Sequence, residues 1–173
     1  MKKSSIYPLP KFFDRYINLV KENDLMDAFN KSAAALENLD MVTLNKIGFK
    51  TYQAGKWTIN DIIQHIIDNE RIQSYRAMRI GRGDKTPLPG YEENLFAKNA
   101  HANKRKLIDL IDELRVLRKS TTQLFRSFDE SVYNNSGICF DQNITVTALG
   151  FVIVGHQQHH LDFIKEKYIP LAE

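Results

Sequence analysis

His156 and His160, two of the five histidines of the sequence, occupy positions where the hydrophobic pattern requires an apolar residue. The pattern runs at intervals of four and three residues through Leu149, Ile153, His156, His160 and Phe163, which is typical of the buried face of a helix. Burying an imidazole without a partner costs on the order of 1 to 3 kcal/mol. A metal ion would satisfy both rings, because residues four apart on a helix can reach one ion and neutral imidazole is a common metal ligand.

His65 stands on a second apolar stripe of the same kind. This stripe consists of Ile62, His65, Asn69 and Ile72. A helix that packs against the first can bring His65 to the histidine pair, so we predict a divalent-metal site formed by His65, His156 and His160 rather than a hydrogen-bonded core cluster. Three neutral ligands leave coordination positions open for a water molecule or a thiolate. The ligand types alone do not choose among zinc, nickel, copper and iron.

The residues around the pair limit the chemistry further. The segment from His156 to His160 has the histidine spacing of the zinc-protease motif, but Gln157 stands where that motif requires the glutamate that acts as general base. A zinc-protease mechanism is therefore excluded. We interpret His159 as a residue that supports a ligand or lies at the surface, and we expect His101 in a solvated loop. The aromatic residues interpreted as ordinary core or interface residues are Phe12, Phe13, Tyr16 and Trp57.

Four long amphipathic segments must position these histidines. Apolar residues repeat with helical spacing over residues 24–39, 58–83, 103–128 and 145–168. Thr58 and Asp61 form a capping box at the start of the second segment, and two prolines in Thr86–Gly90 prevent its continuation. Residues 129–143 form a polar linker with an Asn-Asn-Ser-Gly turn signal. The sequence therefore predicts an all-α protein, a four-helix antiparallel bundle that folds as a single domain over residues 1–173.

Composition and charge narrow the range of partners. The 24 lysines and arginines and 21 aspartates and glutamates are spread along the chain, which disfavours a nucleic-acid partner. The densest basic stretch, residues 71–82, fits the solvated side of a helix. The chain has no apolar stretch of bilayer length, no recognisable signal peptide and one cysteine, so we expect a cytoplasmic protein with no disulfide and no membrane partner. Cys139 is expected to be a small buried or loop residue.

The sequence resembles the DinB-like superfamily of metalloproteins in two motifs, Trp57-Thr58-Ile59-Asn60-Asp61 with His65 and Asp68-Asn69-Glu70-Arg71, and Gly155-His156-Gln157-Gln158-His159-His160. The resemblance implies an up-down-down-up bundle in which His65, His156 and His160 bind a divalent ion, most often nickel or zinc. It also implies a homodimer and a low-molecular-weight thiol as co-substrate, since some members are bacillithiol or mycothiol S-transferases. The chain departs from the family at Gln157, where an acidic residue is common, so no acid or base is expected there.

Three functions are compatible with such a site. The leading hypothesis is a metal-dependent thiol S-transferase that acts on small electrophiles, because an open cationic site lowers the pKa of a bound thiol. Asn69 and Arg76 extend the stripe of His65 and would contact a carboxylate of that thiol. The alternative is a metal-dependent hydrolase, which needs Asp68 or Glu70 to face the metal, and the stripe assignment does not support this. The third is a non-catalytic bundle with a structural metal.

Overall fold

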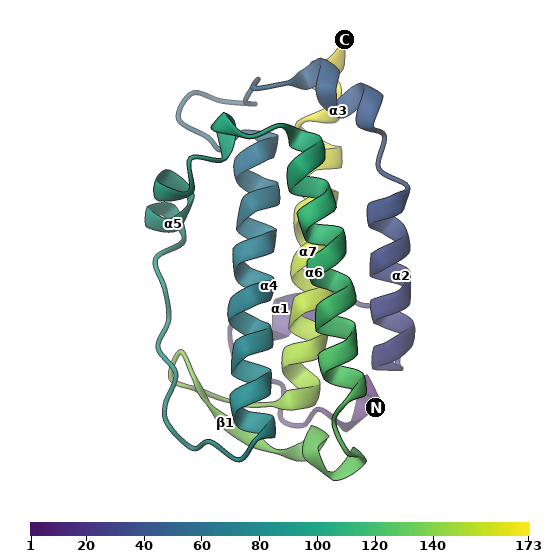
Figure 1. The fold of residues 1–173 in the computed structure, drawn as a ribbon, viewed down its shortest axis with the longest axis vertical. Coiled ribbons are helices and arrows are strands. Elements are labelled where there is room, and N and C mark those ends of the chain that lie inside the picture. The colour runs from purple at the N-terminus through teal and green to yellow at the C-terminus, as the bar shows by residue number, and fades with distance from the viewer.

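Four long helices form the body of the protein in the computed structural model, which describes residues 1–173 (Figure 1). They are α2 (Leu25–Glu37), α4 (Ile59–Gly81), α6 (Leu107–Arg126) and α7 (Val146–Lys167). Along the long axis of the molecule α2 and α7 run in one direction, whereas α4 and α6 run in the other (Figure 1). The all-α bundle and its up-down-down-up order are therefore confirmed, and each of the four predicted segments contains one of these helices. The antiparallel arrangement predicted from the helices alone is wrong for the neighbours α4 and α6, which are parallel.

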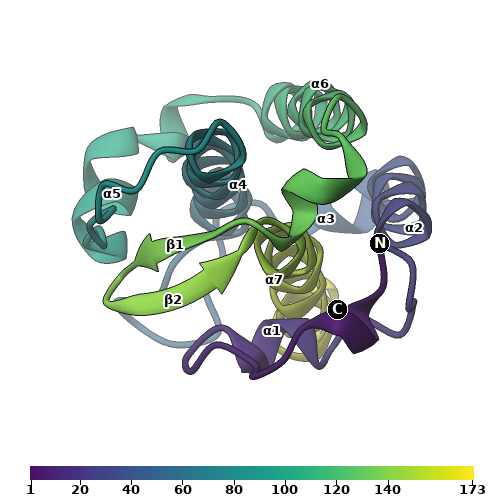
Figure 2. The same cartoon turned by 90° about the horizontal axis from the view of Figure 1, so that it is seen from below.

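Short elements connect the bundle helices and cover parts of its surface. They are α1 (Asp14–Ile17), α3 (Met41–Ile47), α5 (Glu93–Ala100), η1 (Lys3–Ser5), η2 (Ala102–Lys104), η3 (Glu130–Asn134) and η4 (Ile169–Ala172). Because α4 and α6 are parallel, the chain must travel back along the bundle between them, and α5 lies in this connection beside α4 (Figures 1 and 2). On the other side α1 packs against α7. None of the helices combines the length and the apolar character needed to cross a bilayer.

Local side-chain contacts determine where the bundle helices begin. Asp24, Thr58 and Thr145 each accept a hydrogen bond from a backbone N–H in the first turn of the helix that follows. At Thr58 the capping box is complete, because the Asp61 carboxylate accepts the Thr58 backbone N–H at 2.9 Å. No side chain caps α6, which begins at Leu107 after the η2 turn and therefore four residues later than predicted.

Residues 129–143, predicted to be a polar linker, contain most of an antiparallel hairpin instead. The hairpin consists of β1 (Ser136–Cys139) and β2 (Gln142–Thr145) and lies across one end of the bundle (Figure 2). The reverse turn falls at Phe140 and Asp141, whose φ angles are 50° and 58°, and not at the Asn-Asn-Ser-Gly signal. Gly137 of that signal lies within β1, where a Cβ would stand 2.8 Å from a side-chain carbon of Ile80. This glycine therefore permits close packing of the hairpin on α4.

A polar layer crosses the middle of the bundle between two apolar clusters. One cluster of 22 buried residues occupies the end near the hairpin, and a second cluster of 15 occupies the end near α3. The buried polar residues of the layer are Ser32, His65, Asn69, Glu70, Gln73, Arg76, Arg118, Thr121, Thr122, His156 and Gln157. Because buried polar groups cost free energy unless they are paired, each of them requires a partner.

The pairing of Glu70 with Arg118 shows how strongly this layer constrains the fold. The two Glu70 oxygens accept hydrogen bonds from Nε and Nη2 of Arg118 at 3.0 and 2.7 Å, and both side chains are 1% exposed. An Arg118→Met substitution leaves the carboxylate buried without its partner, so we expect it to lower the unfolding free energy by about 3 to 5 kcal/mol. Urea denaturation followed by circular dichroism measures this change.

A double variant provides the control for this prediction. In Glu70→Leu/Arg118→Met both charges are absent, so the double variant is expected to be more stable than Arg118→Met alone. If Arg118→Met unfolds at the same urea concentration as the wild type, the ion pair does not hold α4 to α6.

Candidate metal centre

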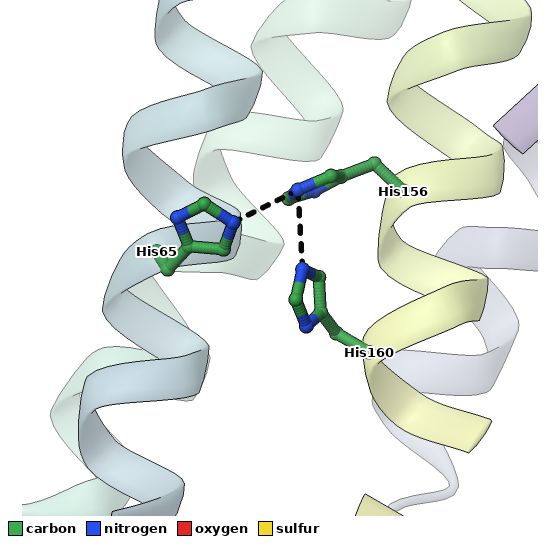
Figure 3. Close-up of side chains that lie close together, drawn as sticks. All are labelled: His65, His156 and His160. Carbon is green, nitrogen blue, oxygen red and sulfur yellow. Dashed lines mark hydrogen bonds between the residues drawn. The ribbon is translucent and has the colours of Figure 1, made fainter. Parts of the chain in front are cut away.

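The three predicted histidines converge at one point in the polar layer (Figure 3). His65 reaches the point from α4, and His156 and His160 reach it from successive turns of α7. The Nε2 atom of His156 lies 3.0 Å from Nε2 of His65 and 3.2 Å from Nε2 of His160. His65 and His156 are 4% and 2% exposed, and His160 is half-buried at the open side of the cluster.

The two distances to His156 Nε2 are those expected for ligands of a single ion, and the three ligand atoms all lie within 4.8 Å of one another. Zinc binds imidazole nitrogens at about 2.0 to 2.1 Å, which places two ligand nitrogens of a tetrahedral site about 3.3 Å apart. Hydrogen bonding alone satisfies the cluster poorly, because a nitrogen of a neutral imidazole carries either one proton or one lone pair. Nε2 of His156 faces the Nε2 atoms of both His65 and His160, so it can form a hydrogen bond with only one of them. The cluster is therefore compatible with the binding of a divalent metal.

The environment keeps all three imidazoles in the neutral form that binds metals. Burial lowers the pKa of His65 to about 4 and the pKa of His160 to about 3. Burial also holds the pKa of His156 well below its ordinary value, and the neighbouring histidines add to this effect. At neutral pH each ring therefore offers a lone pair without first releasing a proton.

Comparison with known proteins places this arrangement in a family. The sequence-family model of the DinB superfamily matches residues 25–164 of this chain. These residues include α2, α4, α6 and both histidine motifs. The chain belongs to the DinB superfamily. The resemblance noted in the sequence is thereby confirmed, whereas the role of each histidine stays a prediction.

Two relatives of this DinB-superfamily chain carry related descriptions. OB0413 from Oceanobacillus iheyensis, provisionally named a metal-dependent hydrolase, is 27% identical over 125 residues, which are 67% of each protein. YfiT from Bacillus subtilis, a provisionally described metal-dependent hydrolase with an unusual four-helix bundle topology, aligns with a TM-score of 0.63 and 19% identity. That alignment covers 94% of this chain and 87% of YfiT, and it shows a shared fold.

Gly155, the first residue of the second DinB motif, allows an aromatic residue to approach the cluster. A Cβ at Gly155 would stand 2.0 Å from the backbone oxygen of Tyr16, so only glycine lets α1 pack this closely on α7. The ring of Tyr16 consequently lies 5.1 Å from that of His156, and the ring of Trp57 lies 5.0 Å from that of His65. Tyr16 and Trp57, interpreted as core or interface residues, are half-buried, and their rings pack against the cluster.

Glu93 is an acidic residue beside the cluster that no pattern in the sequence indicated. Its Oε2 lies 4.0 Å from Nε2 of His65, and its side chain is 58% exposed. Asp68 and Glu70, the two acids considered from the sequence, are engaged elsewhere: Asp68 accepts a hydrogen bond from Gln64, and Glu70 pairs with Arg118. Glu93 begins α5 in the connection between α4 and α6, so no helical periodicity in the sequence relates it to the histidines.

Asn69 and Arg76 both lie inside the bundle and line a pocket that reaches His156. Asn69 donates a hydrogen bond to the hydroxyl of Tyr91 at 3.0 Å. Arg76 is 3% exposed, so the interpretation of residues 71–82 as a solvated face is wrong at this position. The connection that follows α4 covers it, and its guanidinium donates to the carbonyl of Pro89.

The remaining histidines stay outside the cluster. His159 is exposed, and its ring packs 4.9 Å from the ring of His160 and 5.7 Å from that of Tyr16. Its exposure agrees with a surface residue, and a role in supporting a ligand stays a prediction. His101 is exposed at the end of α5 and has a left-handed backbone with φ 50°. Cys139 is fully buried on β1, as expected of a small core residue.

Proposed function

We propose that this protein is a divalent-metal-dependent hydrolase in which His65, His156 and His160 are the ligands. Their convergent neutral nitrogens support this assignment, and nickel and zinc are the ions we expect. When bound, such an ion would supply a positive charge that favours the deprotonated form of a nucleophile. The provisional names of OB0413 and YfiT agree with this class of activity.

The observation that carries the proposal is the carboxylate of Glu93 at 4.0 Å from Nε2 of His65. A hydrolase of this kind needs a base beside the attacking water. In the proposed reaction Oε2 of Glu93 accepts a proton from the water as its oxygen attacks the substrate carbonyl carbon. Glu93 then returns the proton to the leaving oxygen or nitrogen as the bond from that atom to carbon breaks.

A thiol S-transferase is the second candidate, and a different observation favours it. The histidine cluster adjoins two pockets, one that includes His156 and another that includes His160 with Tyr52, Trp57 and Phe163. Two pockets suit a reaction with two substrates. In this reaction Glu93 accepts the thiol proton, the sulfur bonds to the electrophilic carbon, and the leaving group departs.

Parallel assays separate these functions. Protein loaded with nickel or zinc, and the same protein treated with a chelator, are incubated with ester and amide probes and, separately, with a small thiol and an electrophile. Metal-dependent hydrolysis without thiol supports the hydrolase. Metal-dependent conjugation that requires the thiol supports the transferase instead. If neither reaction exceeds the chelated control while the metal raises the melting temperature, the metal is structural and both proposals are wrong.

A further inference from the structure

Arg76 is a buried cation without a buried anion. It is 3% exposed, and its guanidinium bonds only to neutral groups, the side-chain oxygen of Gln73 at 3.2 Å and the carbonyl of Pro89. Arg118, which is buried to the same degree, forms a bidentate ion pair with Glu70. The bundle therefore compensates one of its two buried guanidinium charges and leaves the other without a counter-ion, which is costly in a low-dielectric interior.

No group of the chain supplies the missing charge. Glu93 is the only carboxylate that lines the pocket of Arg76, and it makes no ion pair with the guanidinium. Cys139 and Tyr91 also lie near Arg76, but burial raises the pKa of both, so thiol and phenol are neutral at pH 7. A ligand is then the remaining source of an anion.

Asn69 adds a second unpartnered group to the same pocket. It is 7% exposed, its Nδ2 donates to Tyr91, and its Oδ1 has no hydrogen-bond partner. If the amide is turned so that Tyr91 donates to the oxygen, the amide nitrogen is left free as a donor. The second orientation presents a free donor, which an anionic ligand beside Arg76 requires, whereas the first presents a free acceptor.

Three phenylalanines form an apolar part of the pocket wall, and the pocket extends to the histidines. Phe12, Phe13 and Phe140 line it, and the rings of Phe12 and Phe140 lie 5.2 Å apart while both side chains are 47% exposed. His156 is part of the same lining. A ligand in this pocket would therefore have an anionic group at Arg76, an apolar surface along the phenylalanines, and a third part near the cluster.

We propose that the substrate is an organic carboxylate whose carboxylate group binds Arg76 and Asn69 while its apolar part packs against the phenylalanines. Guanidinium and carboxylate match as planar bidentate partners, which Arg118 and Glu70 already illustrate in this chain. This proposal adds a substrate class to the proposed function. The binding of a carboxylate at Arg76 does not depend on that function, but the statement that the bound carboxylate is the substrate rests on it.

The test measures binding of benzoate and of benzamide, its neutral analogue, by titration calorimetry. The measurement is made on wild type, on Arg76→Met and on the control Arg82→Met, each in metal-loaded and chelated form. Arg82 is the exposed residue that directly follows α4. We expect benzoate to bind wild type and Arg82→Met in both forms and to bind Arg76→Met about 10- to 100-fold more weakly. Benzamide is expected to bind weakly and equally to all three.

Three results would overturn the proposal. The first is that benzoate does not bind wild type, and the second is that it binds wild type and Arg76→Met with equal affinity. The third is that benzoate binds only the metal-loaded protein and that the Arg76→Met substitution does not change its affinity, since benzoate would then be a metal ligand. Should Arg76→Met fail to fold, Asn69→Ala tests the same pocket and is expected to weaken benzoate more than benzamide. Because the chelated protein is included, an inactive enzyme and an absent carboxylate site give different results.

Discussion

A His156→Ala variant is expected to lose its divalent metal and all metal-dependent activity. His156 is 2% exposed and its Nε2 is within 3.2 Å of the Nε2 atoms of His65 and His160, so it is the central member of the cluster. Structural zinc sites are worth on the order of 10 to 16 kcal/mol over four ligands, or roughly 3 kcal/mol for each. Loss of one ligand therefore raises the metal Kd by at least about 100-fold.

Elemental mass spectrometry on protein without a histidine tag measures this effect as metal atoms per chain. His65→Ala and His160→Ala are expected to behave like His156→Ala, and the half-buried position of His160 makes that variant the gentlest for the fold. His101→Ala is the matched control that keeps the metal, because its side chain is exposed and outside the cluster. If wild type takes up no nickel or zinc, or if all three variants retain it, the histidines are only a polar core cluster.

Replacement of Glu93 by glutamine is expected to lower kcat by about 100- to 10,000-fold while the metal content stays unchanged. Glutamine keeps the size of the side chain but cannot accept a proton from the nucleophile. Oε2 of Glu93 lies 4.0 Å from Nε2 of His65, which is close enough for a base that acts on a nucleophile held at the cluster. The measurement is steady-state hydrolysis by metal-loaded protein, with the metal content of each sample determined in parallel.

Glu92→Gln is the matched control for this prediction. Glu92 is the adjacent residue, is exposed, and does not line the pocket at His156. Its substitution changes the net charge by the same amount and is expected to leave kcat within about twofold, as is usual for a surface position. Unchanged kcat in Glu93→Gln would contradict a role as base. Loss of metal in that variant would instead identify Glu93 as a ligand.

The hydrophobic pattern of the sequence was sufficient for the four bundle helices and for the three histidines. Periodicity records which face of a helix is buried, so an imidazole on that face is recognisable without knowledge of its neighbours. His65, His156 and His160 were identified in this way, and the structure brings their Nε2 atoms together. Caps are equally local, which explains why the start of α4 at Thr58 was predicted correctly.

The hairpin at residues 136–145 depended on contacts that the local sequence does not record. A glycine-containing polar stretch is typical of a turn, but Gly137 is required by its packing against Ile80 of α4. The backbone of Leu88 further pairs with β1, donating to the carbonyl of Ile138 at 2.8 Å. These partners are more than forty residues away in the chain, so turn propensity alone assigned the segment to a linker.

The sequence by itself determined the bundle helices and the three buried histidines, whereas the tertiary structure decided which other groups lie beside these histidines. Glu93 reaches the cluster because the parallel order of α4 and α6 requires a long connection that passes beside α4. That connection also buries Arg76, which lies among exposed basic residues in the sequence. Burial by a distant segment leaves no periodic signal in either partner, and for this reason the carboxylate of Glu93 beside the cluster and the buried cation Arg76 appear only in the folded chain.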